Sequence, residues 1–395
     1  MIDGVPLHLA IDASNIRQGG GITHLSQMLA AAEPLAAGIS QVTVWAPRST
    51  VDQLPVRPWL TITSPPWIEG GLPRRVLGQQ ILLKREIFRR GCDVLFSPGG
   101  TIPIRRGIPV VTMSQNLLPF EPFEAARFGR WSPMRLKMWL LRRAQSCSFR
   151  AADGMIFLTQ YAQETVCRWI GGVEERSVTI PHGIERRFSL SPRRSRPTVE
   201  LSVEEPFKLL YVSILMPYKH QVEVARAISD LRGEGYAVQA RFLGGDWGHY
   251  GREFRETLRQ LDPAGEYLEW PGSTPYDRLH NEYGVADAFV FASSCENLPN
   301  ILIEAMAAGL PIACSDRGPM PEVLGNAGIY FDPVHKDSIA NALRRLIDDA
   351  GLREQMAASA WRKSNLYSWE RCARETLAYV AAVARRARMF KETRK

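Results

Sequence analysis

The chain has few of the residues that build metal sites or disulfide frameworks. Its 395 residues include six cysteines and seven histidines. The cysteines are scattered with no Cys-x-x-Cys pair, and no histidines cluster at the spacing of metal ligands. This pattern argues against a structural zinc and favours a reducing compartment. We therefore expect no metal site and no bound cofactor.

Long apolar runs are missing as well. No run approaches the ~18 residues of a membrane-spanning helix, and the short apolar start with acidic Asp3 does not resemble a signal peptide. We expect a cytoplasmic protein. A length of 395 residues with 45% hydrophobic content predicts two domains, each large enough to bury a core.

Positive charge is concentrated in the first part of the chain. Residues 1–150 carry 18 Lys and Arg against nine Asp and Glu, whereas the remainder carries 31 against 32. Two basic stretches, 72–90 and 133–150, also contain many apolar residues. Such segments suit an anionic membrane surface, so we expect a peripheral protein on the inner face of the cytoplasmic membrane. The alternative is a core helix with a solvated basic face.

Strand-like and helical runs alternate along the chain, which predicts an α/β protein with parallel sheets. A first series has strand-like runs at 7–12, 42–45, 94–97, 109–113 and 154–158. A second series contains strands at 208–212 and 238–243 and helices at 221–232 and 250–261. Few apolar residues lie between the two series. The sequence therefore predicts an N-terminal domain at 1–185, a linker at 186–206 and a C-terminal domain at 207–366.

The stretch from 288 to 315 is the most informative. An apolar run, 288–291, precedes a loop with Glu296, then a helix with Glu304, and then a second apolar run. Asn297 or Asn300 is a good helix N-cap and Pro299 suits a first helical turn. Gly309 suits the helix C-terminus, with a proline just beyond it. The unit is predicted to be strand, loop, helix and strand.

This arrangement suits a nucleotide sugar. Ligands bind at the carboxyl ends of strands in open α/β sheets, and free amides at a helix start favour phosphate. Carboxylates such as Glu296 and Glu304 accept hydrogen bonds from ribose and sugar hydroxyls. The alternative is an ordinary capped helix with two solvated glutamates.

The glutamate spacing, followed by Glu-Ala-Met-Ala-Ala-Gly-Leu-Pro, resembles the signature of retaining glycosyltransferases of family 4. That family has the GT-B fold, in which two Rossmann-like domains with parallel sheets face an interdomain cleft. The resemblance implies that Glu296 meets the donor sugar, that Glu304 meets the ribose, and that a helix at 367–395 crosses back to the N-terminal domain. The resemblance also implies that the donor is contacted by Asn297, Leu298, Pro299, Asn300 and Ile301.

The segment 211–220 resembles the first strand and loop of the family's C-terminal domain. There a lysine reaches the donor phosphates, and Lys219 matches it. A lysine is a suitable point charge for the diphosphate that leaves during the reaction. The family usually also has an arginine five positions before this lysine, but Ile214 stands there in this chain. Glu296 and Lys219 are the predicted catalytic residues.

Two glycine-containing loops are further donor contacts in this interpretation. Gly20 and Gly21, in a turn between a predicted strand and helix, are expected to let the backbone approach the donor diphosphate. A tight turn without a ligand is the alternative. Gly272 and Ser273 follow another strand-like run, and in relatives this loop lies near the nucleotide base.

Three polar residues of the N-terminal half are candidates for contacts with the acceptor or the sugar. Gln115 and Asn116 stand where many relatives have His-Asp. Neither side chain titrates, so they are expected to form hydrogen bonds and not to transfer protons. His182 matches a loop at the end of the family's N-terminal domain, although a lone histidine is more often structural.

The resemblance implies a retaining glycosyltransferase of the hexosyltransferase type. Its donor would be a GDP- or UDP-linked sugar, and its acceptor an oligosaccharide or lipid-linked saccharide of cell-surface polysaccharide synthesis. No covalent nucleophile is evident, so a same-face displacement is implied. One rival is a sugar-nucleotide epimerase, which needs acids and histidines that we do not find. Another is an inactive sugar-nucleotide-binding scaffold, motivated by Ile214, Gln115 and Asn116. A third, a nucleic-acid-binding protein, leaves both glutamates unexplained, so we expect no nucleic-acid partner.

Overall fold

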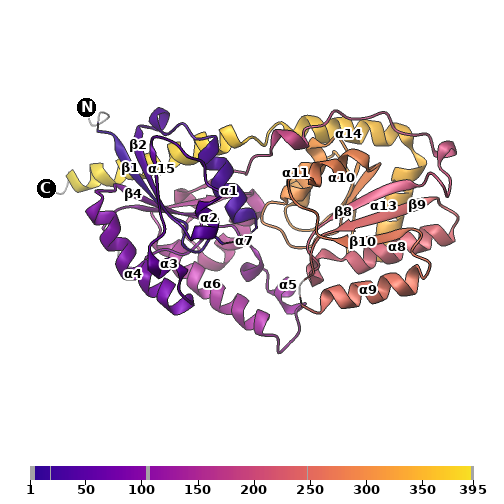
Figure 1. Cartoon of the computed structure of the whole chain (residues 1–395), viewed down its shortest axis with the longest axis horizontal. Coiled ribbons are helices and arrows are strands. Elements are labelled where there is room, and N and C mark those ends of the chain that lie inside the picture. The colour runs from indigo at the N-terminus through magenta and orange to yellow at the C-terminus, as the bar shows by residue number, and fades with distance from the viewer. Residues whose placement is uncertain (1–4, 18, 104–106, 247, 393–395) are drawn as a thin grey trace. The chain divides into compact units, whose positions relative to one another are not determined.

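The chain divides into two units in the computed structural model, which describes residues 5–17, 19–103, 107–246 and 248–392. The first unit takes its described residues from Met1–Phe120, Pro133–Gly183 and Ser368–Lys395. The second takes them from Glu121–Ser132 and Ile184–Tyr367. Figure 1 shows the elements of both units along the chain.

The first unit is built on a parallel sheet. Its described residues form seven strands in the order β3-β2-β1-β4-β5-β6-β7. These strands are β1 Leu7–Asp12, β2 Ile39–Trp45, β3 Leu60–Thr63, β4 Val94–Ser97, β5 Val110–Met113, β6 Gly154–Phe157 and β7 Ser177–Thr179. Residues of β4, β5 and β6 are buried at every position, as expected for strands that helices cover on both faces.

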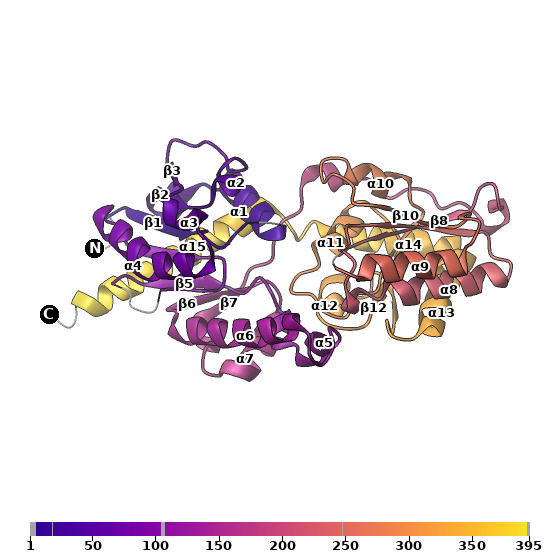
Figure 2. The same cartoon turned by 60° about the horizontal axis from the view of Figure 1, so that its bottom comes forward.

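The helices of the first unit include the two basic stretches of the sequence. Its helices are α1 Gly20–Ala30, α2 Arg48–Val51, α3 Pro66–Glu69, α4 Leu72–Arg89, α6 Pro133–Ala151, α7 Gln160–Ile170 and α15 Trp369–Glu392. Gly19 has a φ of +64°, and α1 begins directly after it, so Gly20 and Gly21 lie in the first turn of this helix and not in the turn before it. Figure 2 shows the same elements from another side.

The last helix packs on the first unit. α15 contacts α1 and strands β4, β5 and β6. The Tyr379 hydroxyl donates to the Arg176 carbonyl at 2.6 Å and accepts from the Met155 amide at 3.2 Å. The Arg388 guanidinium donates to Asp93 at 2.6 Å. The final three residues of the predicted helix 367–395 lie outside the described residues.

The second unit repeats the same sheet order with six strands, β10-β9-β8-β11-β12-β13, all paired in parallel. The strands are β8 Phe207–Val212, β9 Val238–Leu243, β10 Leu268–Gly272, β11 Ala288–Phe291, β12 Ile312–Ser315 and β13 Ile329–Phe331. In each sheet the strand order reverses between two central strands. In the second sheet these are β8 and β11, and ligands of such sheets bind at the carboxyl ends of the strands at this point.

Eight helices belong to the described part of the second unit. They are α5 Pro122–Ala126, α8 Gln221–Gly233, α9 Tyr250–Leu261, α10 Leu279–Val285, α11 Asn300–Ala307, α12 Met320–Leu324, α13 Lys336–Asp348 and α14 Ala350–Ser364. α8 packs against α9 and α13, and α11 packs against α14. No helix of the described residues is both long and apolar enough to cross a membrane.

Two segments of the second unit differ from the predicted plan. Residues 121–132, which contain α5, group with the second unit although their sequence neighbours on both sides belong to the first. Residues 186–206, predicted as a linker, are bonded to the same unit. Arg196 pairs with Asp287 at 2.6 Å, and Arg193 donates to the Ala286 carbonyl at 2.5 Å.

Candidate active site

A buried lysine and a glutamate meet at the carboxyl ends of β8 and β11. Lys219 ends the short turn that follows β8, is 5% exposed, and donates from Nζ to Glu296 Oε1. The two loops are bonded together, since the Ser294 amide donates to the Tyr218 carbonyl at 2.8 Å. Tyr211, from β8, donates its hydroxyl to the Lys219 carbonyl. A cation and a carboxylate are thus fixed where the strand order reverses.

Helix α11 starts just beyond Glu296. Pro299 is its N-cap residue and no side chain caps it, so the predicted Asn297 or Asn300 cap is wrong. The amides of Leu302 and Ile303 reach the Pro299 carbonyl at 2.9 and 3.2 Å. The amide of Ile301 has no acceptor among the residues that the structure describes. The start of α11 therefore retains the free N–H character that attracts anions.

The end of α11 matches the prediction. Ala308 caps the helix and Gly309 follows with a φ of +67°. A Cβ at Gly309 would lie 2.7 Å from the backbone nitrogen of Pro192. Both the conformation and the close approach therefore require glycine at this position.

Glu304 lies one turn into α11 and is 3% exposed. Its carboxylate accepts hydrogen bonds from the hydroxyls of Tyr276, at 3.2 Å, and Tyr283, at 3.0 Å. Burial raises the pKa of Glu304 to about 7, although the two tyrosine hydrogen bonds oppose the shift. The guanidinium of Arg187 covers the Tyr276 ring at 4.5 Å. This carboxyl group changes its ionisation near neutral pH.

The Gly272 loop adjoins the ends of β8 and β9. Gly272 closes β10 with a φ of +94°, and its carbonyl accepts from the Gly244 amide at 2.8 Å. Trp270 donates to the Gly244 carbonyl at 2.9 Å. A Cβ at Gly244 would collide with the Ser213 carbonyl. Three strand ends therefore converge here, and Ser273 follows them in an exposed position.

In the first unit, the structure brings the glycine turn and Gln115 together. A Cβ at Gly21 would lie 3.2 Å from Gln115 Oε1. Gly20, the first residue of α1, directly precedes Gly21 in the chain. Asn116 accepts from the Leu118 amide through its side chain at 3.1 Å, a turn-forming role. Gln115 donates from Nε2 to Met113 Sδ at 3.4 Å, so each of the two side chains has one polar atom engaged within this unit.

His182 lies in a buried aromatic stack. Its ring lies 4.3 Å from that of His24, with an angle of 26° between the planes, and 5.7 Å from Trp369. Burial, and next the charge of His182, lower the pKa of His24. His182 is 5% exposed, so within this unit its role is packing.

The sequence did not single out four side chains of this neighbourhood: Tyr276, Tyr283, Glu124 and Arg127. The tyrosines hold Glu304 from another helix and loop. Glu124 accepts from the Ser294 hydroxyl at 2.7 Å. The partners of Tyr276, Tyr283 and Glu124 lie from 21 to 170 positions away in the chain, so no local pattern points to these contacts. Arg127 is bonded to Glu124, three positions away. Among the described residues no group of three or more His, Cys, Asp or Glu is arranged to hold a metal ion.

Two doubly wound parallel sheets of this order match the GT-B fold. The sucrose-phosphate synthase structure from Thermosynechococcus elongatus superposes with a TM-score of 0.70 and 17% identity, covering 94% of this chain and 97% of that one. HepE of Anabaena, in complex with UDP, gives 0.67 and 16%, covering 98% and 100%. The predicted fold is confirmed.

The family follows from sequence. Residues 20–188 match the family described as Glycosyltransferase Family 4, and residues 193–363 match Glycosyl transferases group 1. The chain belongs to the group 1 glycosyltransferases of family 4, a family of retaining enzymes. O-antigen chain mannosyltransferase B of Escherichia coli is 32% identical over 125 residues, which are 31% of this chain and 33% of that relative. The chain spans about a third to a half of the length of such curated relatives.

Proposed function

We propose that this protein transfers a sugar from a nucleoside-diphosphate sugar to an acceptor hydroxyl with retention of configuration. The observation that carries the proposal is the Lys219–Glu296 pair beside the start of α11, with Glu304 buried one turn further on. Cation, free amides and carboxylates are the groups that diphosphate, sugar and ribose require.

Each of these groups has a distinct task in the proposed reaction. Lys219 and the amides at the start of α11 neutralise charge as the nucleoside diphosphate leaves. Glu296 accepts hydrogen bonds from the donor sugar beside the reacting carbon, and Glu304 accepts them from the ribose. The acceptor hydroxyl attacks from the face that the diphosphate leaves, and its proton passes to the departing phosphate oxygen. No metal ion is required in this mechanism.

The remaining predicted residues support the same chemistry. Gly272 and Ser273 lie where strand ends converge, and we assign them to the nucleotide base. The Asn297–Ile301 segment supplies the backbone of the phosphate-binding loop. In the first unit we assign Gly20 and Gly21 to the donor diphosphate and Gln115 to the sugar or acceptor. We assign the His182 ring to packing within the first unit and the side-chain oxygen of Asn116 to a turn.

For the acceptor, we propose a lipid-linked saccharide of a cell-surface polysaccharide. The partial similarity to an O-antigen mannosyltransferase supports this choice of acceptor. It is also compatible with a GDP-linked sugar as the donor. The complex of HepE with UDP supports a UDP-linked sugar as the donor equally well.

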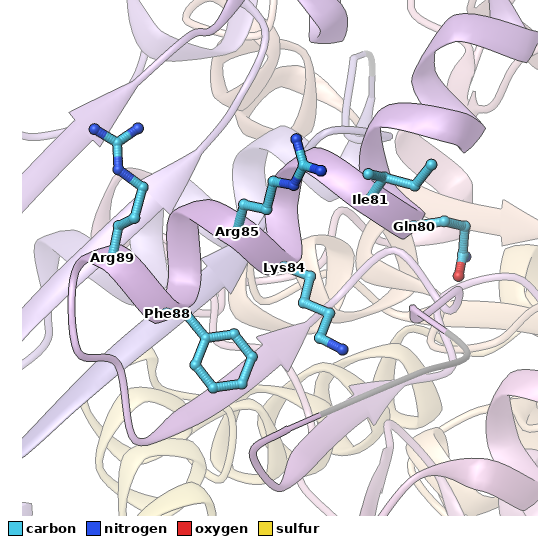
Figure 3. A pocket seen from close by; sticks show the side chains of 6 residues that line it. All are labelled: Gln80, Ile81, Lys84, Arg85, Phe88 and Arg89. Atoms are coloured by element: carbon cyan, nitrogen blue, oxygen red, sulfur yellow. The ribbon is translucent and has the colours of Figure 1, made fainter.

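An anionic membrane surface is the second proposed partner, and α4 carries the strongest evidence for it. A hollow of about 540 Å³ adjoins this helix, and Figure 3 shows Arg85 and Arg89 projecting on one side while Lys84 and Phe88 project on another. The hollow is lined by Gln80, Ile81, Lys84, Arg85, Phe88 and Arg89. The same helix exposes the apolar side chains of Leu72, Val76, Leu77, Ile81, Leu82 and Phe88. Apolar and basic groups exposed together suit a lipid headgroup region.

Helix α6 has a similar surface. Leu136, Trp139 and Leu140 are exposed on it, and the Arg143 guanidinium covers the Trp139 ring at 4.8 Å. Tryptophan and arginine side chains of this kind favour the membrane interface. We therefore propose that α4 and α6 bring the enzyme to its lipid-linked acceptor.

Nucleotide binding tests the function directly. Thermal unfolding should be followed with UDP, GDP, ADP and dTDP in turn. A ligand at about 100 times its dissociation constant stabilises the folded protein by ~2.7 kcal/mol, so the correct nucleotide should raise the melting temperature clearly. If none of the four changes it, the proposed donor site is wrong. Binding without sugar transfer, even with lipid-linked acceptors, would favour the inactive scaffold.

A further inference from the structure

The donor site lacks a cation at one expected position. Ile214 stands where related enzymes usually have an arginine, and its side chain is 46% exposed. The remaining cation, Lys219, is paired with Glu296. A lysine and a glutamate together carry no net charge, whereas a departing nucleoside diphosphate carries several negative charges. Another positive group is therefore needed beside this pair.

A segment from elsewhere in the chain lies against the same loops. Glu121–Ser132 groups with the second unit, and α5 in this segment is labelled in Figure 1. Phe128 packs against Tyr218 and Tyr250, with ring centroids 6.2 and 6.3 Å apart. Glu124 Oε2 accepts from the Ser294 hydroxyl at 2.7 Å, two positions before Glu296. The segment is thus anchored to both loops of the site.

Of the two arginines in this segment, Arg127 is the one bonded to Glu124. Its Nε donates to Glu124 Oε2 at 2.7 Å, and its side chain is 35% exposed. The two terminal nitrogens donate to no residue that the structure describes. A guanidinium fixed through Nε presents its terminal N–H groups as a fork that suits phosphate oxygens.

Arg127 is linked to His220 through Glu124 and Ser294. Burial, and next the charge of Arg127, lower the pKa of His220 to about 4. His220 directly follows Lys219, and its Nε2 lies 3.0 Å from Ser294 Oγ. Arg317 also influences His220, but its guanidinium is shared between two carboxylates, with Nη2 on Asp332 at 2.7 Å and Nε on Asp316 at 3.1 Å. Arg127 is paired with one carboxylate, Glu124, through Nε. Arg127 is therefore the better candidate.

We propose that Arg127 binds the donor diphosphate and takes the place of the arginine that is missing at Ile214. This inference rests on the proposed function, because it concerns the same site. It makes Glu124 a positioning residue, which holds Nε of Arg127 while the Ser294 hydroxyl holds Glu124. The donor site is then assembled from two distant parts of the chain.

Calorimetric titration of UDP and GDP, with uridine and guanosine as phosphate-free probes, tests the inference. Arg127→Ala should weaken binding of the nucleoside diphosphate by about tenfold or more, since charge-assisted hydrogen bonds are lost. Binding of the nucleoside should stay unchanged. Arg130→Ala, on the same segment and stacked over Trp131 at 5.7 Å, is the matched control and should bind as the wild type does.

A rescue variant makes the test specific. In Arg127→Ala with Ile214→Arg, a cation returns at the position usual in the family, and affinity for the diphosphate should recover. Equal affinity of wild type and Arg127→Ala would overturn the role of Arg127 and leave the proposed function intact. Parallel loss of nucleoside and diphosphate binding, or absence of rescue, would also overturn it. Absence of nucleotide binding by the wild type would instead overturn the proposed function itself.

Discussion

Glu304 is a carboxyl group held where its ionised form is costly. Burial raises its pKa to about 7, against 4.5 for an exposed glutamate. Between these values the folded protein holds more protons than the unfolded chain. The free energy of unfolding therefore falls as pH rises from about 4.5 to about 7, by about 3 kcal/mol at most.

This leads to a pH-dependent prediction for Glu304→Gln. Glutamine resembles the protonated form of Glu304 and cannot ionise. The free energy of unfolding of the variant should therefore not show the fall between about pH 4.5 and about pH 7. Its melting temperature relative to wild type should be higher at pH 8 than at pH 5, as measured by thermal unfolding without nucleotide. Glu256→Gln, at an exposed position of α9, is the control. The same difference for Glu304→Gln at both pH values would contradict a raised pKa.

The two glutamates should also separate in kinetics. Glu304, if it holds the ribose, meets a part of the donor that does not change during the reaction. Glu304→Gln should therefore raise KM and weaken binding of the free nucleoside diphosphate. Glu296→Gln should mainly lower kcat, because contacts beside the anomeric carbon tighten as charge develops there. Isothermal titration and steady-state kinetics of both variants measure this. Normal binding and turnover in both would remove this loop and helix from the site.

At the residue scale, only contacts within a local pattern could be predicted. Glu296 and Glu304 are spaced by one loop and one helical turn, so the sequence carries their relation. The partners Tyr276 and Tyr283 reach Glu304 from another loop and helix, and their positions depend on how those elements pack. For His182, the loop motif does not reveal that its ring is stacked on that of His24.

At the element scale, buried strands and regular helices were predictable. The runs at 94–97 and 238–243 coincide with β4 and β9, and 250–261 coincides with α9, because continuous apolar runs and helical periodicity are local properties. The N-cap of α11 was not predictable in this way. Two asparagines there had the better capping side chains, but the loop that contains Glu296 places Pro299 at the cap position.

The exposed face of α4 leads to a prediction at this scale. If α4 meets anionic lipid, the protein should sediment with phosphatidylglycerol vesicles at low salt and be released as salt rises. Arg85→Glu with Arg89→Glu should abolish most of this binding. Arg226→Glu with Arg259→Glu changes the net charge equally, on α8 and α9, and should have little effect. Binding that is equal on neutral vesicles, or equally reduced by both double variants, would contradict a specific role for α4.

At the scale of the whole molecule, two α/β halves could be predicted from the alternation of strands and helices. The division of the chain between them could not. Residues 121–132 have an ordinary loop and short-helix composition, and nothing in it shows that Phe128 packs against Tyr218 and Tyr250. That assignment depends on contacts more than 80 positions apart.

The route of the chain has a consequence for evolution and for protein engineering. The polypeptide passes between the two units four times, at 120–121, 132–133, 183–184 and 367–368. A single recombination event that imports residues 184–367 from a homologue would bring a foreign Ser294 loop but retain the native Glu124 and Arg127. Chimeras that exchange residues 121–132 and 184–367 together should preserve the bond between Ser294 and Glu124. Chimeras that exchange only 184–367 should lose it. A chimera that is to keep the Glu124–Ser294 bond must therefore exchange two separate segments of the chain.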